Sequence, residues 1–384
     1  MELLGKSKEE LREFCQTLGE PAYRAGQIYH AIYSERKFSF AEMTNLPAAL
    51  RKKLVAETTI TLPLIRQRYV SSDKSVRYLF GLGAQEDQPR MKPAAVEAVF
   101  MPNEGRQTIC ISTQAGCAVD CQFCLTAQLG LIRNLSAAEI LGQVLLPLKE
   151  MAGSETDVRP ASSSEDGVAD DGDSLDTETG LAARTNVVLM GQGEPLLNFE
   201  NTFAALRILL DQKGVGLSAK HVTLSTSGVV PGIERMAKEE VRPRLAISLN
   251  ASCDEQRDVL MPINRKYPLR VLMRACREYP LRNREYLTFE YVMLGGVNDT
   301  PEDARRVVRL LAPLKHAKVN LIPWNPGELP FKESTPNSIE EFQRILVDKG
   351  RPTYVRYSRG RDVMAACGQL ALKETSGSAL PILG

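Results

Sequence analysis

The sequence predicts an α/β fold: a partial (β/α)6 barrel that follows a small helical domain and precedes a C-terminal extension. Two observations predict the barrel. Seven apolar, often β-branched runs follow residue 94, and stretches of helical periodicity separate most of them. Strands that alternate with helices form right-handed βαβ units around a parallel sheet. Six such units with one extra strand fit a partial barrel better than a complete eight-fold one.

The elements follow from the position of each run. The expected strands are 108–113, 187–190, 222–226, 244–249, 286–294, 318–323 and 353–357. The expected helices are 136–150, 200–212, 231–238, 268–279, 301–314 and 338–349. Parallel α/β folds place their chemistry at the carboxyl ends of the strands. We therefore look for functional side chains directly after each expected strand.

The region before the barrel, residues 1–90, reads as three amphipathic helices followed by sheet-like sequence. Ser7 and Glu10 match a capping box at the start of the first helix. Three consecutive cations at 51–53 would suit a nucleic-acid surface, although most short charge runs are simply solvated. We expect a small helical accessory domain with aromatic side chains in its core.

An acidic segment, 152–184, interrupts the strand–helix pattern. It holds nine acidic and two basic side chains and no aromatic residue, a net charge of −7. Such a segment cannot bury enough apolar surface to offset the entropy of ordering, so we expect it to be disordered. Because the whole chain carries +1, the remainder carries +8. A basic body suits a polyanionic partner.

Composition limits the compartment and the chemistry. Charged residues break up the N-terminal sequence, which argues against a secretory signal, and no apolar run reaches the roughly 18 residues of a membrane span. We expect a cytoplasmic protein with no membrane partner, and nothing demands more than a monomer. In that compartment the eight cysteines suggest metal or redox chemistry before structural disulfides.

The strongest local signal is a C-x3-C-x2-C run, Cys117, Cys121 and Cys124, just after the expected strand 108–113. Three thiolates on one loop can hold a metal centre. Zinc is the second interpretation, but a structural zinc site needs four ligands and no histidine or further cysteine lies near the run in sequence. A cluster held by three protein ligands leaves one iron free to bind a substrate.

This run, with the aromatic Phe123 before its third cysteine, resembles the radical S-adenosylmethionine (SAM) superfamily. The resemblance implies a 4Fe-4S cluster whose open iron binds the amino and carboxylate groups of SAM. It also implies that an electron from the reduced cluster splits SAM into a 5′-deoxyadenosyl radical. An external electron donor of the flavodoxin or ferredoxin type is then required.

Polar and glycine residues at the other strand ends suit contacts with SAM. Glycine permits close backbone approach, a carboxylate can pair with an amino group, and hydroxyl groups can bind a ribose. A Gly-Pro turn between strand and helix is the alternative explanation of the segment 190–195, and the segments 225–228 and 248–250 are each weak signals when they stand alone. The expected SAM contacts are Gly193, Glu194, Ser225, Ser248, Leu249, Asn250 and, from the family resemblance, Asn325.

Longer motifs narrow the resemblance to the RlmN/Cfr family of radical SAM RNA methyltransferases. They occur in the family's order from about residue 94 to 372, with the acidic insert outside the match. The resemblance implies an RNA-binding role for residues 1–90, a radical SAM barrel over 94–350 and an extension over 351–384 that carries a methyl-accepting cysteine. The matching segments are 193–198, 224–231, 262–264, 290–299, 320–326 and 358–370, together with Cys110 seven residues before Cys117.

The family implies methylation of carbon 2 of adenine, in 23S rRNA at the peptidyl transferase centre and in tRNA next to the anticodon (position 37). Two SAM molecules are used per turnover. One methylates Cys367, and the other yields the radical that activates this methyl group to add to the base. Glu97 maps to the base that removes the carbon 2 proton, and Cys110 then attacks Cys367 and leaves a disulfide.

Other interpretations stay open at this point. From the residues alone, Cys110 and Cys367 would pass for buried small side chains and Glu97 for a surface carboxylate. A related methyltransferase of the Cfr type modifies carbon 8 of the same adenine and shares these cysteines. An iron–sulfur electron carrier or a zinc-binding RNA module would have no use for the pair of Cys110 and Cys367. Asn250 departs from the histidine of many family members, which puts its side-chain contact with SAM in doubt.

Overall fold

The computed structural model describes residues 1–83, 94–103, 105–154, 184–370 and 372. Its main feature is a ten-stranded sheet. From one edge to the other the strands are β1 (Leu64–Val70), β2 (Val76–Leu82), β3 (Ala94–Asn103), β4 (Arg106–Cys110), β7 (Thr185–Leu189), β8 (Val222–Thr226), β9 (Arg244–Ser248), β10 (Leu287–Met293), β11 (Ala317–Pro323) and β12 (Thr353–Val355).

The sheet has an antiparallel flank and a parallel body. β1 to β4 pair antiparallel with one another, and from β4 to β12 every neighbouring pair is parallel. The seven strands of the parallel body are the seven that the apolar runs predict. The α/β class with a central parallel sheet is thus confirmed, and the flank of β1, β2 and β3 adds to it.

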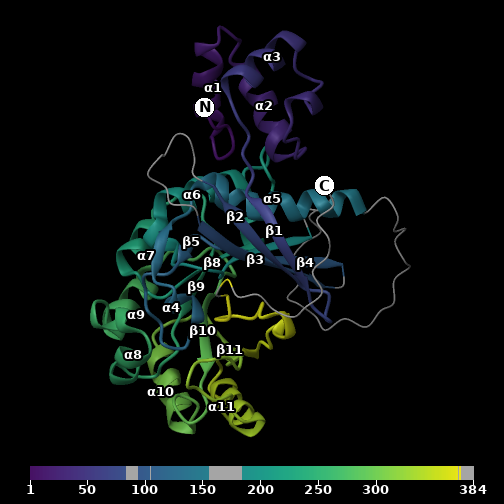
Figure 1. The fold of residues 1–384 in the computed structure, drawn as a ribbon. Helices are drawn as coiled ribbons and strands as arrows, with labels where there is room; N and C mark the ends of the chain where they lie inside the picture. The colour runs from purple at the N-terminus through teal and green to yellow at the C-terminus, as the bar shows by residue number, and fades with distance from the viewer. Residues whose placement is uncertain (84–93, 104, 155–183, 371, 373–384) are drawn as a thin grey trace.

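The helices of the parallel body lie outside the sheet (Figure 1). Six of them match the predicted periodic stretches: α5 (Ala137–Ser154), α6 (Phe199–Leu210), α7 (Val230–Met236), α9 (Leu269–Glu278), α10 (Pro301–Leu311) and α11 (Pro336–Asp348). The prediction missed a short polar helix, a small two-stranded hairpin and the one-turn helix that lies between the strands of this hairpin. These are α8 (Asp254–Leu260), β5 (Gln114–Gly116), α4 (Leu125–Gln128) and β6 (Leu131–Asn134).

Three helices precede the sheet and stand together at one end of the molecule (Figure 1). They are α1 (Lys8–Thr17), α2 (Tyr23–Tyr33) and α3 (Ala48–Glu57). The predicted capping box begins α1, because the Ser7 hydroxyl accepts from Glu10 N and the Glu10 carboxylate accepts from Ser7 N. After α3 the chain enters β1 and β2, which join the main sheet rather than the helices.

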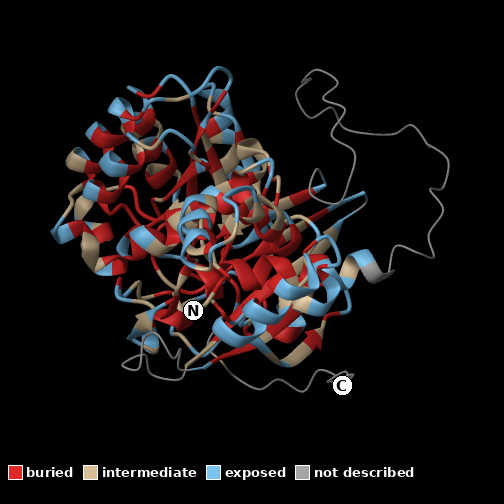
Figure 2. Cartoon of the chain, turned by 90° about the horizontal axis from the view of Figure 1, so that it is seen from above, coloured by how far each residue is buried: buried red, intermediate tan, exposed pale blue. Residues whose placement is uncertain are grey.

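Burial follows the sheet (Figure 2). Side chains of the central strands and the helix faces turned toward them are buried, whereas the outer helix faces are exposed. Phe289 and Tyr291 on β10 are completely buried, and replacing such a ring by alanine costs about 3–5 kcal/mol of folding free energy. The site described below therefore stands on a rigid, well-packed base.

The acidic segment 152–184, which we predict to be disordered, lies outside the described residues except at its ends. α5 runs to Ser154, and β7 begins at Thr185. The segment thus enters β7 at its amino end, opposite to the end at which the parallel strands present their functional residues. In the described part of the chain, none of the helices combines the length and the apolar character that a membrane crossing needs.

Candidate active site

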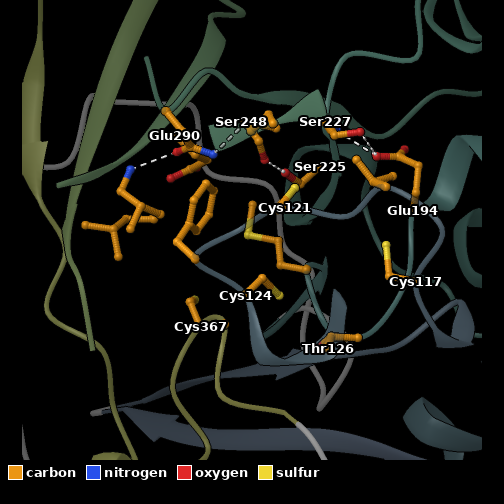
Figure 3. Close-up of a pocket in the computed structure, with 18 of the residues that line it drawn as sticks. Cys117, Cys121, Cys124, Thr126, Glu194, Ser225, Ser227, Ser248, Glu290 and Cys367 are labelled. Atoms are coloured by element: carbon orange, nitrogen blue, oxygen red, sulfur yellow. Dashed lines mark hydrogen bonds between the residues drawn. The ribbon is translucent and has the colours of Figure 1, made fainter. Parts of the chain in front are cut away.

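A cavity of about 170 Å³ opens at the carboxyl ends of the parallel strands. It collects side chains from segments far apart in the sequence (Figure 3). Ten of the thirteen predicted site residues line it: Cys117, Cys121, Cys124, Gly193, Glu194, Ser225, Ser248, Asn250, Asn325 and Cys367. Cys110, Glu97 and Leu249 do not line it.

The hairpin of β5 and β6 fixes the start of the cysteine loop, residues 117–124. Gly116 has a φ of +72°, and a Cβ at this position would lie 1.8 Å from the carbonyl oxygen of Gly130. Only glycine fits there. The N–H of Cys117 then donates to Gly130 O at 3.0 Å, which leads the chain from the hairpin into the loop.

The three thiols face a common, partly desolvated space. Burial raises the pKa of Cys117 to about 12 and raises that of Cys121 well above its usual value. Cys124 and Cys117 raise the pKa of Cys121 further, whereas the Arg257 guanidinium lowers it. A bound cation would favour the thiolates that this environment otherwise disfavours.

The donor set fits an iron–sulfur cluster better than a single ion. Thiolates around one zinc ion converge on it at about 2.3 Å. No three histidine, cysteine, aspartate or glutamate side chains of the described residues converge closely enough to hold one ion. In an iron–sulfur cluster each thiolate binds a different iron, so the sulfur atoms stand apart around a shared cavity. Cys117, Cys121 and Cys124 line one cavity, as three ligands of such a cluster must.

Glu194 lies at the cavity wall, where its carboxylate is already bonded to protein. One oxygen accepts from Leu196 N at 3.1 Å, and the other accepts from both the N–H and the hydroxyl of Ser227 at 2.7 Å. Burial raises the pKa of Glu194, and the bonds from Ser227 oppose that shift. The carboxylate therefore ties the turn after β7 to the end of β8 as well as facing the cavity.

The ends of β8 and β9 supply hydroxyl groups. Ser225 and Ser248 stand with their oxygens 3.4 Å apart, and both face the cavity. Leu249, in contrast, is completely buried, and its N–H donates to Glu290 O at 2.9 Å within the sheet.

Asn250 occupies a left-handed backbone conformation, with a φ of +55°. Asparagine adopts this region more readily than most residues. Its side-chain oxygen accepts from Val292 N at 2.8 Å, and its amide lies 3.4 Å from the sulfur of Met261. Asn250 thus lines the cavity while fixing the loop after β9 to β10.

The C-terminal segment lies directly on the cysteine loop. Leu125 N donates to Gly368 O at 2.8 Å, and the Thr126 hydroxyl donates to Leu370 O at 2.7 Å. Asn325 donates to Cys367 O at 3.2 Å, and also to the Ser358 hydroxyl. Asn325, predicted as a SAM contact, therefore also anchors the segment.

These bonds bring a fourth thiol, that of Cys367, into the cavity of the cysteine loop (Figure 3). The Cys367 side chain is exposed there and follows a short 3-10 turn instead of lying on a helix. Removal from bulk water within the cavity, with smaller contributions from Glu290 and Cys124, raises the pKa of Cys367 to about 11.

Cys110 ends β4 behind the same segment. It is buried and packs in an apolar cluster with Val363 and Leu370 from the C-terminal segment. Burial, followed by the neighbouring Cys367, raises the pKa of the Cys110 thiol. All eight cysteines are free thiols, so Cys110 and Cys367 are close but not joined.

Glu97 lies on β3, outside the cavity. Its carboxylate forms a buried ion pair with Arg77 of β2, and the two side chains are 1% and 0% exposed. The other carboxylate oxygen accepts from Leu372 N at 3.1 Å. Glu97 thus touches the C-terminal segment five residues after Cys367, a contact that its position in the sequence does not reveal.

Sequence reasoning missed Glu290 as a site residue. This carboxylate lies on β10, lines the cavity and accepts from the Asn320 amide at 3.0 Å. Burial raises the pKa of Glu290 to about 7, although the bond from Asn320 lowers it. The available signal was a charged residue in the middle of a largely apolar strand.

Comparison with known proteins agrees with this geometry. Residues 1–60 match the model of a ribosomal RNA large subunit methyltransferase N-terminal domain, and residues 169–311 match that of the radical SAM superfamily. A probable dual-specificity RNA methyltransferase RlmN from Koribacter versatilis is 46% identical over 94% of this chain and 98% of its own length. The chain belongs to the RlmN family of radical SAM methyltransferases.

Other members of the RlmN family cover the chain equally well. The dual-specificity RNA methyltransferase RlmN from Anaeromyxobacter dehalogenans is 42% identical over 96% of this chain and 91% of its own length. The crystal structure of a radical SAM methyltransferase from Sphaerobacter thermophilus superposes with a TM-score of 0.83 at 36% identity, covering 97% of this chain and all of that one. Membership of the RlmN family makes the chain a methyltransferase rather than an electron carrier or a zinc-binding module.

Proposed function

We propose that the protein methylates carbon 2 of adenine in RNA, at the peptidyl transferase centre of 23S rRNA and at position 37 of tRNA, with Cys367 as the methyl carrier. One observation carries the proposal. The exposed thiol of Cys367 lies in the cavity that Cys117, Cys121 and Cys124 also line. A methyl group on that sulfur would face a cluster-bound ligand at short range.

The chemistry of the target explains why such a carrier is needed. Carbon 2 of adenine lies between two nitrogens and is too electron-poor to attack the methyl group of SAM. A sulfur nucleophile can accept that methyl group by simple displacement once its proton is lost. Cys367 serves as this nucleophile, and a first SAM molecule is its methyl donor.

Three cysteines and the strand ends prepare the second step. Cys117, Cys121 and Cys124 would hold a 4Fe-4S cluster, which together with a second SAM molecule supplies a hydrogen-abstracting radical when an external flavodoxin or ferredoxin provides the electron. In this proposal the hydroxyls of Ser225 and Ser248, which line the cavity, orient SAM, and Asn325 holds the backbone of Cys367 through a bond to its carbonyl oxygen. The methyl group on Cys367 loses a hydrogen atom there and adds to carbon 2 of the adenine.

Glu97 and Cys110 complete the cycle on the other side of the C-terminal segment. Glu97 takes the carbon 2 proton, and its contact with Leu372 N keeps it beside that segment. The adduct also gives up its unpaired electron, which the cluster would take back. The Cys110 thiolate then attacks the Cys367 sulfur, and the bond between that sulfur and the methylene carbon breaks with its electron pair on carbon. A proton added to this carbon completes the methyl group. The packing of Cys110 against Val363 and Leu370 supports this role. The resulting disulfide must be reduced before the next turnover.

The test uses purified, unmodified 23S rRNA and tRNA in separate reactions with reconstituted enzyme, SAM and a reductant. Digestion and mass spectrometry of the nucleosides should give 2-methyladenosine from both RNAs. 8-Methyladenosine would instead establish the Cfr-type reaction, and a product from only one RNA would refute dual specificity. The basic body of the chain and the expected cytoplasmic location agree with both RNA substrates.

A further inference from the structure

A completely buried arginine, Arg257 on α8, lies next to the cysteine loop and has no role in the mechanism above. The sequence gives no sign that this arginine is buried, because arginines on short polar helices are usually exposed. Burying a guanidinium costs several kcal/mol unless hydrogen bonds and an anionic partner compensate it. The identity of that partner is therefore informative.

The hydrogen bonds of Arg257 run to neutral acceptors. Nε donates to Leu249 O at 3.1 Å, and Nη2 donates to Ser227 O at 2.6 Å and to Ser248 O at 3.1 Å. Nη1 donates to the side-chain oxygen of Asn264 at 3.1 Å. These bonds tie the ends of β8 and β9 to α8, but they do not neutralise the charge.

The nearest aspartates are engaged elsewhere. Asp254 and Asp258 each accept from the Asn264 amide, at 2.9 Å and 2.7 Å, so Asn264 stands between them and Arg257. Ser227 and Ser248, whose carbonyl oxygens accept from Arg257, line the same cavity as Cys121. Gln122 N of the cysteine loop donates to Leu260 O at the end of α8 at 3.0 Å. The buried cation thus faces the cysteine loop.

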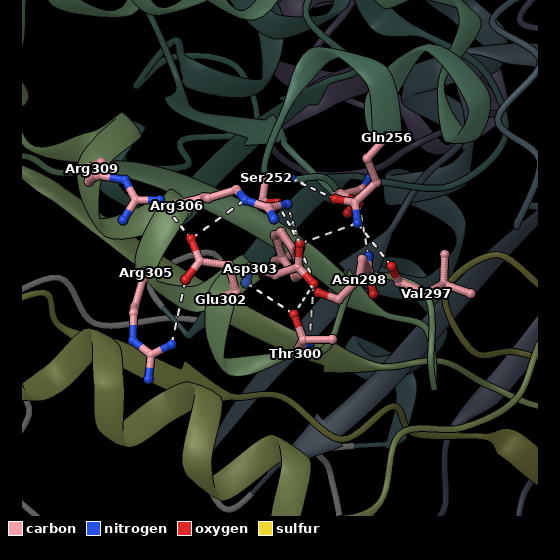
Figure 4. A network of polar contacts seen from close by, with 12 residues as sticks. Ser252, Gln256, Val297, Asn298, Thr300, Glu302, Asp303, Arg305, Arg306 and Arg309 are labelled. Carbon is pink, nitrogen blue, oxygen red and sulfur yellow. Dashed lines mark hydrogen bonds and ion pairs between the residues drawn. The ribbon is translucent and has the colours of Figure 1, made fainter.

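A separate network holds the start of α8, the helix that carries Arg257 (Figure 4). Asp303, at the start of α10, accepts from the Ser252 hydroxyl at 2.5 Å and from the Gln256 amide at 3.3 Å. Thr300 and Arg306 complete this network. Because Asp303 secures residues 252–256 independently of Arg257, a change at Arg257 removes the charge beside the cavity while the start of α8 stays anchored.

We propose that Arg257 is the built-in counter-charge of the cluster and raises its reduction potential. Three thiolates outweigh the positive charge of a 4Fe-4S core, so the liganded cluster is anionic and becomes more so when it accepts an electron. A fixed cation in a low-dielectric setting stabilises the reduced state over the oxidised state. The inference rests on the proposed function only through the presence of a cluster, and it requires neither RNA nor methyl transfer.

The test is a potentiometric titration of the reconstituted cluster, followed by electron paramagnetic resonance without SAM or RNA. Arg257→Gln removes the charge, and Arg257→Lys keeps it while losing the forked hydrogen bonds. Arg242→Gln is the matched control, because this arginine also bonds two carbonyls but precedes the amino end of β9. The glutamine variant should be at least tenfold harder to reduce, a potential about 59 mV lower. Arg257→Lys and Arg242→Gln should stay within threefold of wild type.

Every other outcome of the titration either supports or overturns the proposed role of Arg257. An unchanged potential in Arg257→Gln, or equal shifts in the Gln and Lys variants, overturns the proposal. If Arg257→Gln cannot hold iron but Arg257→Lys does so at the wild-type potential, the need for charge is supported. Loss of iron from both variants with native circular dichroism shows that the hydrogen bonds matter instead, and overturns it. Methylation of carbon 2 by the wild-type enzyme is measured in a separate assay. A failure of the proposed function can therefore be told apart from a failure of the proposed role of Arg257.

Discussion

Arg77 and Arg257 are both completely buried, yet the two regions around them balance charge in different ways. Arg77, in the antiparallel flank, forms an ion pair with Glu97 and lies 4.2 Å over the ring of Tyr69. Arg257, at the carboxyl ends of the parallel strands, bonds to carbonyls and an amide. The charge of Arg77 is thus balanced within the protein, whereas the counter-charge that we propose for Arg257 is a bound cluster.

The largest loss of activity is expected when the cysteines that line the cavity are replaced. Cys121→Ala and Cys367→Ala should each lower RNA methylation more than about a thousandfold, as expected when a group that acts covalently or holds the cofactor is lost. They should differ in reductive cleavage of SAM, which Cys121→Ala abolishes and Cys367→Ala retains. The readouts are methylated RNA and 5′-deoxyadenosine.

The matched control for both variants is Cys276→Ala, a buried cysteine on α9 away from the cavity. It should keep both activities. Loss of SAM cleavage in Cys367→Ala would show that this thiol serves the cluster rather than the methyl transfer.

Cys110→Ala tests the link between the two regions, since Cys110 lies between the flank and the C-terminal segment. Of the two cysteines Cys110 and Cys367, only Cys367 acts in the first half of the reaction, so the Cys110→Ala variant should stall after Cys367 has become linked to the base. A covalent protein–RNA adduct should accumulate to a large fraction of the enzyme and be visible as a shifted band that nuclease removes. Normal turnover without an adduct would eliminate the resolving role of Cys110.

Changes to the ion pair of the flank should lower stability, in addition to the loss of activity expected from the proposed role of Glu97 as a base. Glu97→Gln leaves the Arg77 guanidinium buried without its carboxylate, so the free energy of unfolding should fall by about 3–5 kcal/mol. The double variant Arg77→Met/Glu97→Gln should recover part of that loss, because the uncompensated charge is gone. Chemical denaturation of the cluster-free protein measures both.

A control for the flank is Glu341→Gln, which breaks the exposed pair with Arg344 and should leave the unfolding midpoint unchanged. A small effect of Glu97→Gln, equal to that of Glu341→Gln, would contradict the closed ion pair. Glu97→Gln should also lose RNA methylation, whereas Glu341→Gln should keep it.

The smallest effect is expected from the acidic insert. Deletion of 155–183 with a short linker should leave methylation within about twofold of wild type, because α5 ends and β7 begins on the side away from the cavity. Steady-state rates with rRNA and tRNA measure this. A large drop in either rate would give the insert a role in catalysis or substrate binding.

Local patterns in the sequence explain much of the fold. The run 222–226 has the same bounds as β8, and the remaining parallel strands differ from their predicted ranges by at most a few residues. These strands are readable because continuous β-branched runs specify buried parallel strands. α8 was missed because it has only seven residues and is mostly polar.

The sequence predicts the site residues that belong to a motif at the end of a strand. It does not predict those whose position depends on tertiary contacts. Cys117, Cys121 and Cys124 lie within eight residues of one another in sequence, so a local motif is enough to predict that they share a cavity. The docking of Leu370 on Thr126 joins residues 244 positions apart, and no local pattern encodes it. Arg257 and Glu290 were missed for the same reason, because their burial depends on the packed sheet.

The most direct measurement of the central claim follows the methyl group itself. Wild-type enzyme with a reconstituted cluster would be incubated with methyl-deuterated SAM, without RNA or reductant, and its peptides mapped by mass spectrometry. The account predicts a deuterated methyl group on Cys367 and on no other cysteine. A label on a different residue, or full RNA methylation by enzyme whose Cys367 never carries a label, would contradict it.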